Sequence, residues 1–148
     1  MKRLHIHISV DDIKANIPFY SALFEAAPSV IEADYAKWML EEPKVNFAIS
    51  SRGGKTGLDH LGIQVESDAE LHEIHQRLSK AALPVIEQKG TACCYAESDK
   101  YWIKDPQGIP WEAFHSLKSV PIFGETPSPV DAPEASSCCT PSFKGKCC

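Results

Sequence analysis

The first 118 residues of the chain repeat one order of structural patterns twice. Residues 4–10 and 58–65 both alternate polar and apolar side chains, and this period of two predicts a strand in each case. Each strand pattern leads into a helical pattern, over about 12–24 and about 68–82, and then into short strand patterns. The repeat therefore predicts two βαβββ modules of about 55 residues, at about 1–55 and 56–118.

The fold prediction can be made more detailed from one proline and from the short strand patterns. Pro18 lies inside the first helical pattern, where a proline removes a backbone hydrogen bond, so we expect a kink or a restart there. We predict an α+β fold whose two modules form one cupped mixed sheet. The short strands are expected around 29–33, 36–40 and 45–50, and then around 84–88, 92–97, 100–104 and 110–115.

The alternation also assigns each strand residue to one face of the sheet. His5 and His60 occupy matching positions in the two modules, each on the face opposite the apolar side chains. If the sheet curls into a cup, the two histidines converge inside it. His7 shares the face of His5, and we expect it to lie behind a ligand rather than to be one. Trp102 and Phe114 are expected in the core.

The composition changes near residue 119. Residues 119–148 are rich in Pro and Ser and show little apolar periodicity. Such a segment cannot bury enough apolar surface to offset the entropy lost on ordering. We therefore predict a folded domain over 1–118 and a flexible, disordered, cysteine-rich tail over 119–148.

All six cysteines occur as adjacent pairs: Cys93–Cys94, Cys138–Cys139 and Cys147–Cys148. A zinc knuckle needs a Cys-x-x-Cys spacing, which the chain lacks. The start of the chain lacks the apolar run of a signal peptide, so a cytoplasmic protein with reduced thiols is expected. The net charge of -5 argues against a nucleic-acid or anionic membrane partner.

Four parts of the chain carry a resemblance to a known family: His5, Phe19–Tyr20, Leu58–Gly62 and Asp105–Glu112. Together they resemble the vicinal oxygen chelate superfamily, which includes glyoxalases, extradiol dioxygenases and fosfomycin-resistance proteins. The resemblance implies a glyoxalase/dioxygenase-like fold and a metal held by His5, His60 and Glu112. The first-module counterpart of the Glu112 strand, 45–50, contains no Glu or His, which leaves coordination positions open and favours Fe(II) over other divalent metals.

Gly90–Ala96, followed by Asp99–Trp102, is similar to the organoarsenical carbon–arsenic lyases and the cadmium-induced proteins of that superfamily. The resemblance implies Fe(II)- and O2-dependent cleavage of the carbon–arsenic bond in trivalent organoarsenicals, such as methylarsenite or aromatic arsenicals, with release of arsenite. It also implies that Cys93 and Cys94 bind the substrate. The arsenic atom of such a compound carries one carbon substituent and two ligands that exchange. Two thiolates can replace both exchangeable ligands and leave the carbon–arsenic bond unobstructed.

Two other functions remain open. A thiolate protein that binds arsenic or cadmium without turnover is one, and another glyoxalase-like metalloenzyme is the second. The thiols of the tail are expected to have an accessory role, in which they collect arsenical or retain the arsenite product. These thiols are Cys138, Cys139, Cys147 and Cys148. With two modules in one chain, a monomer can close its own cup, and a homodimer is also compatible.

Overall fold

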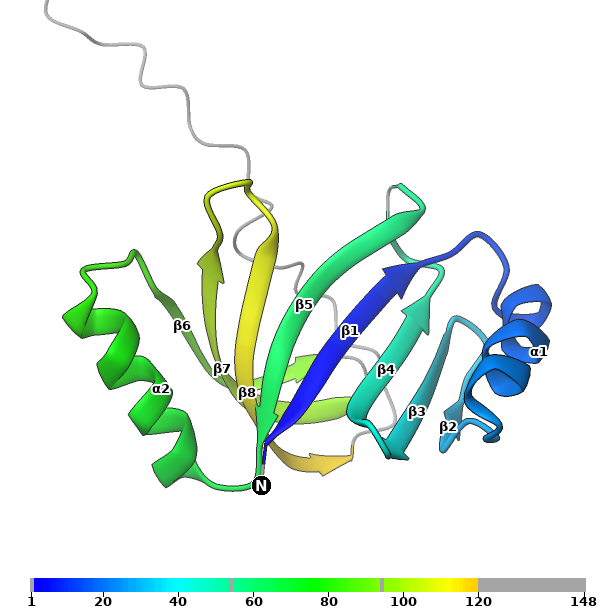
Figure 1. The fold of residues 1–148 in the computed structure, drawn as a ribbon, viewed down its shortest axis with the longest axis horizontal. Helices are drawn as coiled ribbons and strands as arrows, with labels where there is room; N and C mark the ends of the chain where they lie inside the picture. Colours follow the sequence, from blue (N-terminus) through cyan, green and yellow to red (C-terminus); the bar gives the residue numbers. More distant parts are fainter. Residues whose placement is uncertain (1, 54, 94, 120–148) are drawn as a thin grey trace, which may run out of the picture.

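A computed structural model describes residues 2–53, 55–93 and 95–119, and its helices and strands follow the predicted order (Figure 1). The first module consists of β1 (Arg3–Ser9), α1 (Ile13–Phe24), β2 (Val30–Ile31), β3 (Tyr35–Glu41) and β4 (Lys44–Ser50). The second consists of β5 (Gly57–Val65), α2 (Asp68–Lys80), β6 (Ile86–Cys93), β7 (Ala96–Lys104) and β8 (Pro110–Ser119).

The two modules share one eight-stranded sheet in the order β2-β3-β4-β1-β5-β8-β7-β6. The central strands β1 and β5 pair antiparallel and join the modules. Each of them pairs in parallel with the last strand of its own module, β4 or β8, so the sheet is mixed. The sheet is strongly curved, with one helix on the outer side of each half (Figure 1). The prediction of an α+β fold with tandem βαβββ modules is confirmed.

Each helix begins at a capped residue and covers its own half of the sheet. The side chain of Asp12 accepts a hydrogen bond from the backbone N–H of Ala15, and Ser67 caps α2 in the same way. Apolar burial between helix and sheet stabilises both halves, because neither helix is long enough to persist alone. The first core contains Ile13, Ala36, Trp38, Val45, Phe47 and Ile49, and the second Val65, Leu71, Ile74, Tyr101 and Ala113.

Two local predictions need correction. The helix α1 does not restart at Pro18 but runs from Ile13 to Phe24 with this proline inside it, because its packing against the sheet outweighs the lost hydrogen bond. The four strand patterns of the second module form three strands, since the turn between β6 and β7 divides the expected strand 92–97. The turn lacks the Asn-Gly or Gly-Gly signal that would mark it, and Tyr95 takes a positive φ of 61° there.

The concave face of the sheet is polar and buried. On β1, His5, His7 and Ser9 are at most 5% exposed, whereas Leu4, on the opposite face, is 43% exposed. Side chains that prefer water are therefore enclosed at the centre of the molecule, where each needs a partner. Neither helix in the described part of the chain has the length and apolar character required to cross a membrane.

Candidate metal centre

His5 and His60 face each other across the central strand pair, with their Nε2 atoms 3.2 Å apart. The Nδ1 of His5 lies 2.9 Å from the carbonyl oxygen of Asn46, which only accepts, so this nitrogen carries a proton and donates it. The Nδ1 of His60 donates in the same way to the carboxylate of Asp59, at 2.5 Å. Both Nε2 lone pairs therefore point at one place, and a cation or a shared proton must lie between them.

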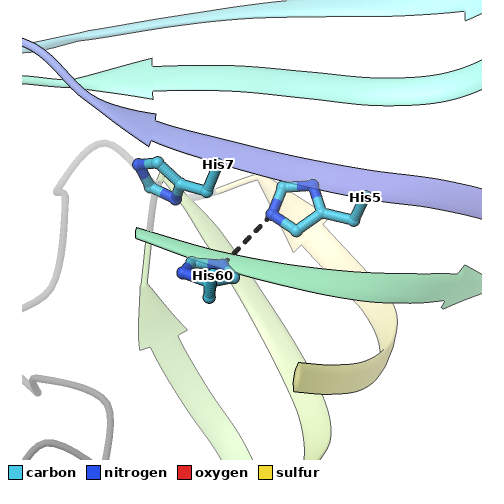
Figure 2. Close-up of side chains that lie close together, drawn as sticks. All are labelled: His5, His7 and His60. Carbon is cyan, nitrogen blue, oxygen red and sulfur yellow. Dashed lines mark hydrogen bonds between the residues drawn. The ribbon is translucent and has the colours of Figure 1, made fainter. Parts of the chain in front are cut away.

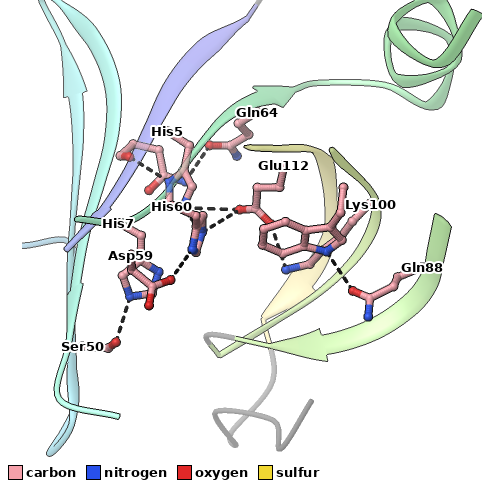
Figure 3. Close-up of polar contacts among 11 residues, drawn as sticks. His5, His7, Ser50, Asp59, His60, Gln64, Gln88, Lys100 and Glu112 are labelled. Atoms are coloured by element: carbon pink, nitrogen blue, oxygen red, sulfur yellow. Dashed lines mark hydrogen bonds and ion pairs between the residues drawn. The ribbon is translucent and has the colours of Figure 1, made fainter. Parts of the chain in front are cut away.

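Glu112 adds a carboxylate to this pair. Its Oε1 lies 3.4 Å from the Nε2 of His5 and 3.4 Å from that of His60, and the side chain is buried (Figure 3). Bonds of about 2.1 Å to one metal ion would place neighbouring ligand atoms about 3.0 Å apart. Two imidazoles and one carboxylate on one side of a point are the donor set of open Fe(II) sites, so the residues fit a divalent metal.

Lys100 holds the other oxygen of this carboxylate. Its Nζ lies 3.2 Å from Oε2 of Glu112, and both side chains are about 5% exposed. Burial raises the pKa of Glu112, but the charge of Lys100 and the contacts with His60 and His5 lower it by more, so the pKa lies well below its usual range. The carboxylate is therefore ionised and oriented before any metal binds.

The two histidines differ in protonation. Burial lowers the pKa of His5 to about 4, although the charge of Glu112 opposes this. Burial also lowers the pKa of His60, but its hydrogen bonds to Asp59 and Glu112 and their charges raise it by more, to about 9. At neutral pH the metal-free site therefore holds one proton beyond the two Nδ1–H groups, and His60 carries it.

This proton makes metal binding depend on pH. A divalent cation bound by both imidazoles would displace it, so we expect the association constant for Mn(II) to rise about tenfold per pH unit below pH 9 and to level off above it. Mn(II) suits the test because thiolates bind this hard ion poorly. Competition titrations between pH 6.5 and 8.5 measure the slope. An association constant that does not change over this range would contradict the protonated His60.

A β-bulge brings Asp59 to the side of His60. The partner of His7 is His60 and that of Ile8 is Leu58, so Asp59 is the extra residue of β5. Strict alternation places adjacent residues on opposite faces, and the bulge removes this restriction. Ser9 Oγ donates to the second oxygen of Asp59, at 3.2 Å.

Gly62 allows the close approach of Glu112. The two residues are register partners on β5 and β8. A Cβ atom at residue 62 would lie 2.6 Å from the backbone oxygen of Glu112 and 2.8 Å from its Cγ. Because any side chain here would displace Glu112, glycine is the residue that this strand position accepts.

Aromatic rings line the centre. Trp102 packs against the ring of His60, with 5.2 Å between centroids, and Phe114 packs against that of His5, also at 5.2 Å. Both were expected in the core, and both are buried, but they face the histidines and not the helices. They exclude water from the ligand atoms and strengthen the electrostatic contacts there.

His7 lies beside these residues and was not expected to be a ligand. The three histidines each offer a ring nitrogen within 4.8 Å of those of the other two (Figure 2). This set is looser than the set of His5, His60 and Glu112. The Nε2 of His7 lies 2.8 Å from Ser50 Oγ, and burial together with the charge of His60 lowers its pKa to about 3.

Cys93, the member of the predicted thiol pair that the structure describes, lies at the end of a strand. Cys93 ends β6 and its register partner, Ala96, begins β7. Cys94 and the tail thiols predicted to be accessory lie outside the described residues. The next side chain, that of Tyr95, donates a hydrogen bond to Asp34 of the first module, at 2.6 Å, and its ring lies 5.6 Å from that of Tyr35. The ring of Tyr35 in turn lies 6.2 Å from that of His7, so aromatic contacts connect Tyr95 to the candidate metal centre.

Sequence comparison places the chain among known proteins. The model of the Glyoxalase/Bleomycin resistance protein/Dioxygenase superfamily matches residues 2–113. Two proteins named trivalent organoarsenical cleaving enzyme, from Thermomonospora curvata and Bacillus sp. (strain MD1), are 35% and 38% identical to the chain; the matches cover 98% and 96% of it and 93% and 92% of the relatives. The cadmium-induced protein CadI of Mycobacterium bovis is 37% identical over 94% of the chain and 93% of its own length.

Solved structures agree on the fold. An extradiol ring-cleaving dioxygenase from B. fuscum matches with a TM-score of 0.58 at 15% identity, covering 80% of this chain and 33% of the dioxygenase. A catechol 2,3-dioxygenase matches with a TM-score of 0.57 at 18% identity, covering 78% and 41%. At these identities the likeness concerns the arrangement of the strands and helices alone.

Proposed function

The chain belongs to the Glyoxalase/Bleomycin resistance protein/Dioxygenase superfamily, and from this premise we propose that it cleaves the carbon–arsenic bond of trivalent organoarsenicals, with Fe(II) and O2, and releases arsenite. The observation that carries the proposal is the convergence of His5, His60 and Glu112 at mutual distances of 3.2–3.4 Å. The names of the relatives supply the substrate class. The reaction would serve organoarsenical detoxification.

The three ligands that we propose are held by their neighbours. The carbonyl of Asn46 and the carboxylate of Asp59 orient the two imidazoles, and Lys100 orients the carboxylate. An Fe(II) ion bound there would supply the activation of O2, since three protein ligands leave positions open. Another divalent ion in place of iron is compatible with the same donor set.

Cys93 and Cys94 are proposed to bind the substrate. Each thiol would replace one hydroxyl of methylarsenite, which leaves as water, so that two arsenic–sulfur bonds form and the methyl group stays free. Arsenic is a soft element and thiolates are the soft ligands of proteins. Held at the turn beside Tyr95, the arsenical would reach the metal centre already oriented, which removes much of the entropic barrier.

The hydrogen bond between Tyr95 and Asp34 gives a test of this placement. In Tyr95→Phe the turn loses this hydrogen bond to Asp34 of the first module, and we expect KM for methylarsenite to rise roughly threefold to tenfold with little change in metal affinity. Tyr101→Phe is the matched control, because it removes a tyrosine–carboxylate contact with Glu87 elsewhere on the hairpin. A KM rise of equal size in both variants would contradict a specific role of Tyr95.

The alternative is a thiolate protein that retains arsenic or cadmium without turnover, and the number of turnovers separates the two. With a hundredfold excess of methylarsenite over reduced, iron-loaded protein, arsenic speciation should show many arsenite molecules released per chain. Bound arsenic that stops at one to three equivalents, with the methyl group intact, would support sequestration. The buried ligand set favours the enzyme, because thiol binding alone does not need it.

We further propose that the folded unit spans 1–118, that the tail thiols pass arsenical to Cys93 and Cys94 or retain product, and that the protein acts in the cytoplasm as a monomer or homodimer. Within the described residues the two modules already share one sheet in a single chain, which supports a complete site in each copy. The negative net charge supports the expectation of no nucleic-acid or membrane partner.

A further inference from the structure

His7 is buried inside the cup with one ring nitrogen unused. The side chain is 3% exposed, and its Nδ1 has no hydrogen-bond partner among the described residues. A buried polar atom without a partner is rare in folded proteins, because it loses its contacts with water and gains nothing in return. The strand pattern predicts only that His7 lies behind a ligand, whereas the unpartnered Nδ1 indicates that His7 binds a ligand itself.

The other ring nitrogen explains why Nδ1 is available. Ser50 Oγ lies 2.8 Å from Nε2 and accepts its proton in the tautomer that leaves the Nδ1 lone pair free (Figure 3). In His5 and His60, too, the outer ring nitrogen is held by a carbonyl or a carboxylate, while the inner one faces the common centre with Glu112. A histidine that binds a metal usually donates its second ring N–H in this way.

The ring positions fit a common centre (Figure 2). The centroid of His7 lies 4.7 Å from that of His60 and 6.1 Å from that of His5, and those of His5 and His60 are 5.2 Å apart. With bonds of about 2.1 Å, imidazoles at adjacent positions of one ion have centroids roughly 4.6 Å apart, and those at opposite positions roughly 6.5 Å. His60 therefore stands adjacent to both others, and His5 and His7 approach opposite positions.

We propose that Nδ1 of His7 is a fourth protein ligand of the metal held by His5, His60 and Glu112. The inference rests on the proposed metal centre and changes its chemistry. An octahedral ion would keep two open positions in place of three. The strand β4 has no histidine or carboxylate at 45–50 that could serve as a fourth protein ligand. The fourth ligand would instead come from β1, the parallel neighbour of β4.

Proton NMR of the full chain loaded with one equivalent of Co(II) counts the imidazole ligands directly. Each bound imidazole retains one exchangeable N–H proton, whose signal the paramagnetic ion shifts far outside the normal range. We expect three such signals in the unchanged protein, two in His7→Ala, and three in His72→Ala, which removes an exposed histidine of α2. Thiolates that bind cobalt contribute no signal of this kind.

The count in the unchanged protein decides the question even if His7→Ala does not fold. Two shifted signals, each lost in one of His5→Ala and His60→Ala, would overturn the role of His7 and leave the metal centre of the proposed function intact. No shifted signal at all, with Co(II) bound only through thiolates, would overturn the metal centre and with it both proposals.

Discussion

Replacing Glu112 with glutamine is expected to abolish arsenite release, with a loss on the order of 10^3-fold or more. The change removes the negative charge that faces both Nε2 atoms at 3.4 Å, and it adds an amide that can turn a hydrogen toward the metal. A metal site whose protein ligands are all uncharged stabilises a divalent cation poorly. Metal content after dialysis and arsenic speciation measure the two effects in the same sample.

Two controls belong with this experiment. Glu87→Gln alters a carboxylate of β6 that contacts Lys89 and Tyr101 and not the histidines, and it should leave both metal content and turnover unchanged. Circular dichroism must show that the Glu112 variant still folds, because Lys100 loses its buried ion pair. A folded Glu112→Gln protein that keeps its metal and its turnover would refute Glu112 as a ligand.

Replacing Cys93 with serine should reduce arsenite release to background while the metal stays bound. One thiolate remains, so the arsenical loses the second, intramolecular bond, and we expect its affinity to fall on the order of 10^2-fold or more. The hydroxyl of serine does not replace a thiolate for a soft element. Calorimetric titration with methylarsenite, together with metal analysis, separates the loss of substrate from the loss of metal.

The tail provides the matched control for this second change. The variant Cys138→Ser/Cys139→Ser removes one adjacent thiol pair and should retain turnover. If the tail variant and not the Cys93 variant lost activity, the substrate would have to bind at the tail, and our assignment of the turn between β6 and β7 would be wrong.

Periodicity was sufficient to predict the fold and the meeting of two histidines. The alternation around His5 and His60 depends only on the period of a strand, and the repeat of the module places both at the central strand pair. The burial of this face could not be read from the residue types, because polar side chains on one face usually indicate contact with water.

Contacts that depend on irregular backbone, or on the register between distant strands, could not be predicted from the sequence. The bulge at Asp59 has no sequence signal, and strict alternation would put Asp59 and His60 on opposite faces of the sheet. Lys100 meets Glu112 only because β7 and β8 pair in one particular register. The link from Tyr95 to Asp34 joins residues 61 positions apart, which no local pattern records.

The direct test of the central claim is arsenic speciation after aerobic incubation of the reduced, Fe(II)-loaded full chain with methylarsenite, run beside anaerobic and metal-free samples. We expect repeated release of arsenite in the complete mixture and none when either oxygen or iron is left out. Arsenite release that continues without iron and oxygen, or methylarsenite that stays intact in the complete mixture, would contradict it.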